Sequence, residues 1–236
     1  MKVLVLGHNG MLGHMVCRYL YENDIEVVVH KVKWPLNQKA ITDFDGDYII
    51  NCIGAIPQKT DDFHINWKLP IWLDMYAPCR IVHPGTDCEG DDDEYGKSKA
   101  VAAEYIRTNS KQTKSIKSSI IGPELKSKAG LFEWFMSQEG EVDGYSGAFW
   151  NGVTTLEWSK QCLNLIRNWE SPKYLNETII YSSPCSKYDL LHVIKTVFNK
   201  DIKINEKRIG KYKCLEGLIN TGNIYNQLKE LKEYYY

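Results

Sequence analysis

The fold of this chain is decided by residues 2–13, Lys-Val-Leu-Val-Leu-Gly-His-Asn-Gly-Met-Leu-Gly. A short apolar strand runs into Gly7, Gly10 and Gly13, apolar side chains follow at helical spacing, and residues 26–30 resume a strand. A glycine turn that opens a helix leaves backbone N–H groups at the positive end of the helix dipole, where a dinucleotide pyrophosphate binds. We therefore predict a βαβ unit of nucleotide-binding type; a plain glycine turn without a ligand is the alternative.

A tyrosine and a lysine lie four residues apart downstream of this unit. Tyr95 and Lys99 share one helix face, and they follow a fourth apolar strand, residues 80–83, and Thr86. Such a pair on its own is typical of a solvated helix surface, but its order after the glycine turn favours a catalytic triad. Lys99 would favour the tyrosinate and lower a phenol pKa that starts near ~10. Thr86 would donate to or orient a substrate carbonyl oxygen.

With these motifs the chain resembles the extended short-chain dehydrogenases/reductases of the dTDP-4-dehydrorhamnose reductase type. The matching segments are 7–13, 51–55, 65–66, 86–88, 95–99, 118–122, 130–134, 151–155 and 186–190. The last four of these segments resemble a subgroup that acts on UDP-linked 2-acetamido-2,6-dideoxy sugars. The resemblance implies NADPH-dependent reduction of the 4-keto group of a nucleotide-linked 4-keto-6-deoxy sugar, with NADH as the second cofactor to consider.

The resemblance implies three groups of site residues and no metal site. The catalytic residues are Thr86, Tyr95 and Lys99. The cofactor-binding residues are Gly7, His8, Asn9, Gly10, Met11, Leu12, Gly13, His30, Lys31, Cys52, Ile53, Gly54, Asn66, Tyr95, Lys99 and Ile121. The substrate-binding residues are Thr86, Asp87, Trp134, Trp150, Asn151 and Thr154. Two alternatives stay open here: the tryptophans could close the core under a loop, and Thr154 or Thr155 could cap the helix that follows.

The end of the second strand favours NADPH over NADH. Sites selective for NAD usually place an acid there for the ribose 2′-hydroxyl, whereas NADP sites carry basic neighbours for the 2′-phosphate. This strand ends Val-His-Lys-Val-Lys over residues 29–33, without a carboxylate. We therefore expect His30 and Lys31 to contact the 2′-phosphate.

Two departures from the family pattern concern the catalytic segment. Gly85 stands where the family usually has serine, and the loop between Thr86 and Tyr95 is cut to residues 88–94, which should leave the site more open. The acids at 91–94 suit a helix N-terminus, and we prefer this interpretation to metal binding. Dehydration or epimerisation is a second hypothesis, but Cys88 stands where dehydratases have the second acid. A noncatalytic cofactor-binding regulatory subunit is the third.

Composition sets wider bounds on the class of protein. The 236 residues are 43% hydrophobic with a formal net charge of -1, which gives no electrostatic reason to invoke nucleic acid or a membrane. Seven scattered cysteines without C-x-x-C argue against a zinc site and a disulfide framework, and no apolar run approaches the ~20 residues of a membrane span. We expect a soluble cytoplasmic protein whose partner is a nucleotide sugar. A homodimer through the apolar helix near residues 62–76 is left open.

The predicted fold is α/β, a Rossmann-type doubly wound parallel sheet with a smaller C-terminal substrate-binding lobe. Strands are expected at 2–6, 26–30, 47–52, 80–83 and 115–121, and helices at 10–22, 62–76, 94–109 and 155–169. The Rossmann core is assigned to residues 1–122 with 145–182 interleaved, and the lobe to 123–144 and 183–236. Beyond residue 121 we expect a loop, a short helix at 131–138 and an irregular stretch at 142–153.

Overall fold

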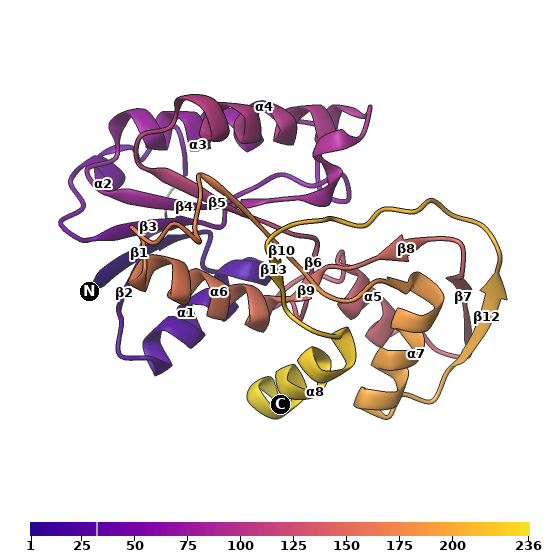
Figure 1. Ribbon diagram of the computed structural model, residues 1–236. Coiled ribbons are helices and arrows are strands. Elements are labelled where there is room, and N and C mark those ends of the chain that lie inside the picture. The colour runs from indigo at the N-terminus through magenta and orange to yellow at the C-terminus, as the bar shows by residue number, and fades with distance from the viewer. Residues whose placement is uncertain (32) are drawn as a thin grey trace. The chain divides into compact units, whose positions relative to one another are not determined.

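The computed structural model (Figure 1) describes residues 1–31 and 33–236 and divides into two compact, interleaved units. The first unit comprises Met1–Lys117 and Ser159–Thr178, and the second comprises Ser118–Trp158 and Ile179–Tyr236. The sequence-based boundaries differ from these, because they assign 118–122, 145–158 and 179–182 to the Rossmann core. The difference arises from strand pairing: β6 (Ile120–Ile121) pairs with β9 (Val153–Thr154) within the second unit.

The first unit is built on a parallel sheet with the strand order β5-β4-β3-β1-β2. The bounds of these strands are β1 (Lys2–Leu6), β2 (Glu26–Val29), β3 (Tyr48–Asn51), β4 (Arg80–Gly85) and β5 (Thr113–Lys117). β10 (Glu177–Tyr181) begins beside β5, where the Ser115 N–H donates to the Asn176 carbonyl at 2.7 Å. Every residue of β3 is buried, as expected for a sheet covered on both faces. The predicted parallel sheet is confirmed.

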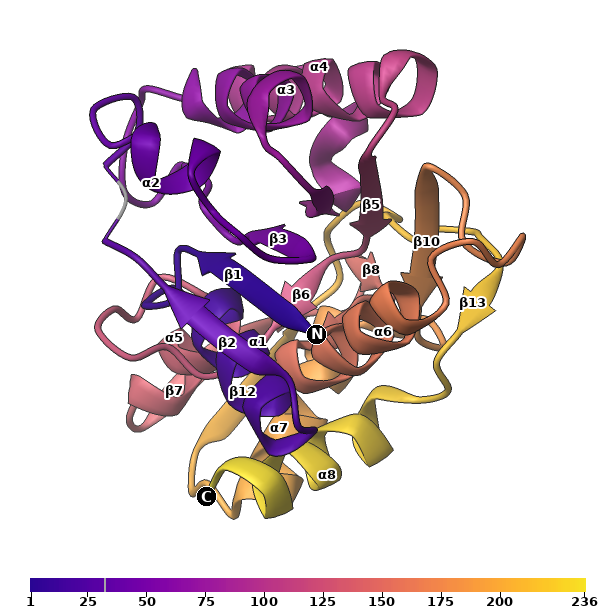
Figure 2. The same cartoon turned by 90° about the vertical axis from the view of Figure 1, so that its left-hand side faces the viewer.

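Helices cover both faces of this sheet, which makes the first unit doubly wound (Figures 1 and 2). The helices are α1 (Met11–Glu22), the short α2 (Lys39–Thr42), α3 (Ile65–Tyr76), α4 (Glu94–Asn109) and the part of α6 (Thr155–Arg167) that belongs to this unit. α3 and α4 lie together on one face, and α1 lies on the other. On the α3 face, Leu69 and Leu73 pack fully buried against Ile49 and Ile81 of the sheet. This packing anchors α3, and with it the residues at its first turn.

Two element boundaries in the first unit differ from the sequence prediction. β5 ends at Lys117 instead of continuing to residue 121, because the Ser119 carbonyl accepts a hydrogen bond from the Val153 N–H and leaves the central sheet. α3 starts at Ile65 instead of residue 62, because the Asp62 carboxylate accepts hydrogen bonds from the N–H and the ring Nδ1 of His64, at 3.0 and 2.8 Å. This local turn holds the segment before α3 out of the helix.

The second unit contains four short strand pairs and three helices of its own. The pairs are β6 with β9, β7 (Glu141–Tyr145) with β12 (Lys203–Lys207), β8 (Phe149–Trp150) with β11 (Cys185–Ser186), and β10 with β13 (Ile219–Asn220). The helices are α5 (Leu131–Ser137), α7 (Lys187–Phe198) and α8 (Ile224–Tyr235). The irregular stretch expected at 142–153 is therefore wrong, since it holds three strands. Within the described ranges, 1–31 and 33–236, no helix has the length and apolarity needed to cross a bilayer.

Candidate active site

The glycine turn after β1 is shaped by close backbone approaches. Gly7 has a φ of +75°, and a Cβ on it would lie 2.7 Å from the Cys52 carbonyl oxygen, while a Cβ on Gly13 would lie 2.2 Å from the Gly7 carbonyl oxygen. A side chain at either position would push α1 or the end of β3 away from the turn. Gly10 is the N-cap of α1 and gives it no side-chain cap, so that the helix starts with backbone alone.

The surroundings of this turn fit a phosphate-bearing cofactor. The first turn of α1 carries no acid, and Nδ1 of His8 is buried without a hydrogen-bond partner. The side chain of Asn9 lies 3.0 Å from the other His8 ring nitrogen, and both Asn9 and Gly10 are exposed. Leu12 and Gly13 are buried in the packing of α1 against the sheet. The predicted residues 7–13 therefore separate into an exposed turn and a buried helix start that supports it.

The segment after β3 is fixed by two buried asparagines. Asn51 accepts from the Ile53 N–H at 3.2 Å and lies 3.2 Å from the ring Nδ1 of His83. Asn66, at the start of α3, accepts from the Ala55 N–H at 2.7 Å and donates to the Ala55 carbonyl at 3.0 Å. Its amide also donates to the Ser98 hydroxyl of α4 at 3.1 Å. Asn66 therefore links the loop that follows β3 to α4. Asn66 was predicted to bind the cofactor, and in the structure its side-chain amide makes these internal hydrogen bonds.

Lys99 lies at this loop, beside Gly54. A Cβ on Gly54 would lie 3.5 Å from Lys99 Nζ and 3.4 Å from the Asn66 side-chain oxygen. Lys99 is 8% exposed whereas Gly54 is exposed, so the ammonium is buried directly under an accessible backbone. Burial lowers the pKa of Lys99, and the nearby Glu89 and Cys88 oppose that change. The structure thus brings together three predicted residues, Gly54, Asn66 and Lys99.

Tyr95 stands in the first turn of α4, one helical turn before Lys99. Its half-buried ring meets Phe63 edge-on at a centroid distance of 5.7 Å. Asp93 caps the helix by accepting from the Gly96 N–H at 2.6 Å, which confirms the prediction that the acidic run serves a helix N-terminus. A Cβ on Gly96 would lie 2.5 Å from the Cys88 carbonyl oxygen. The start of α4 is therefore packed directly against the segment that follows Thr86.

Thr86 directly follows β4 and caps a 3₁₀ turn, η1 (Asp87–Gly90). Its hydroxyl accepts from the Cys88 N–H at 3.3 Å and donates to the Asp87 carboxylate at 3.2 Å. The Glu89 carboxylate accepts from the Thr86 N–H at 2.9 Å, which completes a capping box. Sequence reasoning missed Glu89, although the Thr-x-x-Glu spacing of residues 86–89 was the signal that could have found it.

The neighbouring residues Cys52 and His83 both have pKa values shifted toward the neutral form. Burial raises the pKa of the Cys52 thiol well above its usual value, with Cys162 and Cys17 adding to the effect. Burial lowers the pKa of His83 well below its usual value, and the charge of Lys99 acts in the same direction. His83 is also the hydrogen-bond partner of Asn51.

The predicted residues of the second unit are mostly engaged inside that unit. Trp150 is 4% exposed and donates its indole N–H to the Ser119 hydroxyl, and Asn151 exchanges two hydrogen bonds with the backbone of Leu215. Thr154 accepts from the Glu157 N–H at 3.2 Å, which is the helix-capping alternative. Ile121 is buried, whereas Trp134 is 36% exposed. Of the four predicted substrate-binding residues in this unit, Trp134 is the one with an accessible side chain.

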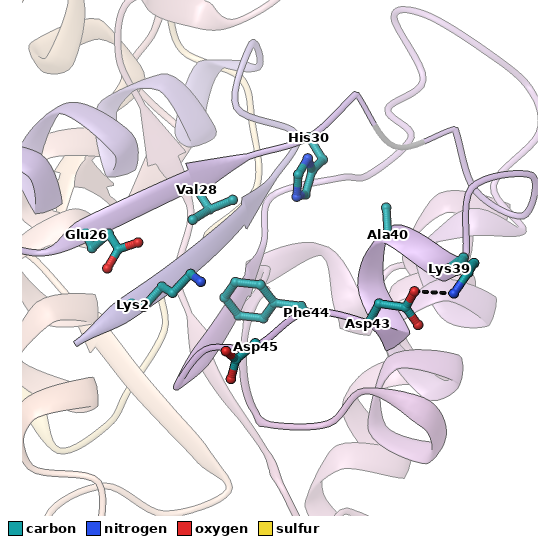
Figure 3. Close-up of a pocket in the computed structure, with 9 residues that line it drawn as sticks. All are labelled: Lys2, Glu26, Val28, His30, Lys39, Ala40, Asp43, Phe44 and Asp45. Carbon is teal, nitrogen blue, oxygen red and sulfur yellow. Dashed lines mark hydrogen bonds and ion pairs between the residues drawn. The ribbon is translucent and has the colours of Figure 1, made fainter.

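The predicted 2′-phosphate contacts lie at the open edge of the first unit's sheet. His30 and Lys31 are exposed, and His30 lines a pocket of about 580 Å³ along β1 and β2 (Figure 3). Phe44 and Val28 form its apolar wall, and Lys39 pairs with Asp43 on the far side. Both charge signs line the pocket: Lys2 and Lys39 against Glu26, Asp43 and Asp45. The second-strand residues are thus accessible to a ligand, in a site of mixed charge.

Solved structures resemble the chain over nearly its whole length. The dTDP-4-dehydrorhamnose reductase of Clostridium acetobutylicum matches with a TM-score of 0.77, 18% identity and 99% of both chains covered. The Bacillus anthracis dTDP-4-dehydrorhamnose reductase, solved with NADP, matches with a TM-score of 0.80 and 13% identity, over 100% of this chain and 99% of that one. The Bacillus anthracis dTDP-glucose 4,6-dehydratase, solved with NAD, matches with a TM-score of 0.73 and 15% identity, over 100% and 96%.

At sequence identities of 13–18%, the similarity to these solved structures shows a shared fold and no more. No family model and no curated protein sequence matches the chain. The chain therefore shares the fold of these reductases and this dehydratase, as its motifs predict, and a shared fold does not by itself fix the chemistry.

Proposed function

We propose that this protein is an NADPH-dependent reductase of the 4-keto group of a nucleotide-linked 4-keto-6-deoxy sugar. The observation that carries the proposal is the buried ammonium of Lys99, one helical turn from Tyr95 and directly under the exposed backbone of Gly54. A buried lysine without a functional reason is rare, because burial penalises its charged form. Parallel strands place the turn after β1, the loop after β3 and Thr86 after β4 at one edge of the sheet, where ligands bind in such folds.

NADPH fits the residues of this edge and would supply the hydride when bound. The exposed turn at Asn9 and Gly10 would receive the pyrophosphate, with the unpartnered His8 nitrogen beside it. Lys99 would hold the ribose of the nicotinamide through the opening beside Gly54. NADPH is preferred to NADH because His30 and Lys31 are exposed at the end of β2.

The protein's own groups would handle the proton. Tyr95 would donate its phenolic proton to the sugar oxygen as negative charge develops there, and the Lys99 ammonium would stabilise the tyrosinate that remains. Thr86, half-buried at the end of β4, would turn its hydroxyl hydrogen from Asp87 to the same oxygen. Glu89, the one acid in η1 besides Asp87, is bound to the Thr86 N–H and to Lys117, which speaks against its use as the second acid of a dehydratase.

Substrate class and setting are the finer parts of the proposal. We favour a UDP-2-acetamido-2,6-dideoxy-hexulose over dTDP-4-dehydrorhamnose, on the resemblance of residues 130–134 and 151–155, and Trp134 is the accessible aromatic of that set. A cytoplasmic enzyme fits its seven cysteines, which are scattered through the sequence without a C-x-x-C motif.

The test is NADPH consumption by the purified protein against a panel of UDP- and dTDP-linked 4-keto-6-deoxy sugars. We expect turnover of a UDP-linked member, and a fall in kcat of about 10²–10⁴-fold for Tyr95→Phe with NADPH binding retained. A parent protein that reduces no member of the panel, and that Tyr95→Phe leaves unchanged, would contradict the reductase and favour a regulatory subunit.

A further inference from the structure

The Glu89 carboxylate occupies the space beside Gly85, at the end of β4. Gly85 pairs with Lys117 across the sheet, and a Cβ on Gly85 would lie 3.0 Å from Glu89 Oε1 and 3.0 Å from Lys117 Cβ. Both contacts are tighter than ordinary van der Waals packing. Glycine at position 85 therefore leaves room for the carboxylate of Glu89, which lies in the following turn, η1.

This carboxylate has two direct partners and is almost fully buried. One oxygen accepts from the Thr86 N–H at 2.9 Å, and the other lies 2.5 Å from Lys117 Nζ. The side chains of Glu89 and Lys117 are 8% and 16% exposed. A buried ion pair contributes little net stability, because desolvation offsets the attraction. Because this ion pair is hydrogen-bonded to Thr86, a predicted catalytic residue, we look for a functional role rather than a stabilising one.

Glu89 is the first of a line of charged groups. Beyond Lys117 stands Glu177, 4.0 Å away and 13% exposed, which in turn lies 3.9 Å from Arg107. Glu89 also raises the pKa of the buried Lys99 against the effect of burial, with Cys88 acting in the same sense. His83 is buried, and the charge of Lys99 lowers its pKa further. Glu89 is thus a carboxylate whose charge favours the protonated form of Lys99.

We propose that Glu89 is a positioning residue of this active site, which fixes Thr86 at the end of β4 and places a buried negative charge next to it. The inference rests on the reductase proposed above and adds to it a residue from the shortened 88–94 loop. In that loop, the Glu89 carboxylate would then occupy the space that a side chain at residue 85 would otherwise fill. The group that holds Thr86 would also favour the protonated form of Lys99.

The test compares Glu89→Gln with Glu170→Gln, which makes the same change at an exposed carboxylate paired with Arg80. Glu89→Gln keeps an oxygen for the Thr86 N–H and removes the charge. We expect the alkaline limb of the kcat/KM profile, which belongs to the coupled Tyr95–Lys99 pair, to move down by about one pH unit. Glu170→Gln should leave it in place. A Glu89→Gln protein that stays folded with an unmoved limb would overturn the proposal.

Two further measurements do not need turnover. Glu89→Gln should weaken NADPH binding more at alkaline than at neutral pH, by about tenfold, because Lys99 loses its proton earlier. Gly85→Ser should lower the thermal midpoint in the parent and lower it less in a Glu89→Ala background, where the space is vacant. An inactive parent that shows both effects would refute only the reductase. Equal pH dependence of NADPH binding in parent and Glu89→Gln, together with additive effects of the two substitutions, would refute the role of Glu89.

Discussion

Gly13→Ala tests the packing of the glycine turn. Its Cβ would lie 2.2 Å from the carbonyl oxygen of Gly7 and 2.7 Å from the carbonyl carbon, both backbone atoms that no rotamer change can move. Reaching ordinary contact needs a shift of more than ~1 Å between α1 and the turn. Overpacking of this kind costs about 1–3 kcal/mol, and alanine's helix propensity returns at most about 1 kcal/mol. We expect a net loss of about 2 kcal/mol in the free energy of unfolding.

Gly10→Ala is the matched control, because its single close contact, 3.3 Å to the same Gly7 oxygen, needs only a small adjustment. For a chain of 236 residues, a loss of about 2 kcal/mol lowers the melting temperature by about 4–8 °C. Urea unfolding of both variants gives the stability readout, and NADPH titration compares Gly13→Ala with the parent, where we expect affinity to fall at least tenfold. A Gly13→Ala protein as stable as Gly10→Ala and as NADPH-competent as the parent would refute the geometry of the turn.

Three further predictions concern single groups. Lys99→Met should weaken NADPH binding and also lower kcat, since one ammonium serves both; a loss in kcat alone would place it away from the ribose. Lys31→Ala should shrink the preference for NADPH over NADH by about tenfold, or ~1.4 kcal/mol, and equal affinities in the parent would contradict the assignment of the second strand. The pKa of His83 in the folded protein lies well below the usual histidine value of 6.5. As the pH falls from 6.5 toward that lower pKa, the unfolded state binds a proton that the folded state does not, so the folded state loses stability. Urea unfolding across this pH range should show that the free energy of unfolding depends less steeply on pH in His83→Gln than in the parent.

The strands and helices of the first unit were predictable because each has a strong local signal. Continuous apolar runs mark β1, β3 and β4, and the acidic run before Tyr95 marks the start of α4 at Glu94, with Asp93 as its cap. The end of β5 was not predictable, since the chain leaves the sheet at Ser119 to meet Val153, a partner 34 positions away that no local pattern announces. The two-residue strands of the second unit are too short to show a period.

The motifs predict which residues belong to the candidate site, and the structure shows what the side chains of those residues contact. Asn66 was predicted as a cofactor contact, and its side-chain amide instead hydrogen-bonds Ala55, in the loop after β3, and Ser98 of α4. Asn151 was predicted as a substrate contact, and its amide is spent on the backbone of Leu215. A side-chain amide serves either purpose equally well, so the sequence pattern predicts the residue type while the three-dimensional partners decide its use.

Gly85 carries the same argument one step further. From sequence, glycine at this position is simply a missing serine hydroxyl, and Glu89 is one acid among several in residues 89–94. The structure connects the two, because the Glu89 carboxylate lies where a Cβ on Gly85 would be crowded, and binds the Thr86 N–H from there. The loss of a side chain and the shortening of the loop are then one change, in which a buried carboxylate takes over the space at the end of β4. Whether it also takes over part of the chemistry is what the pH profile of Glu89→Gln decides.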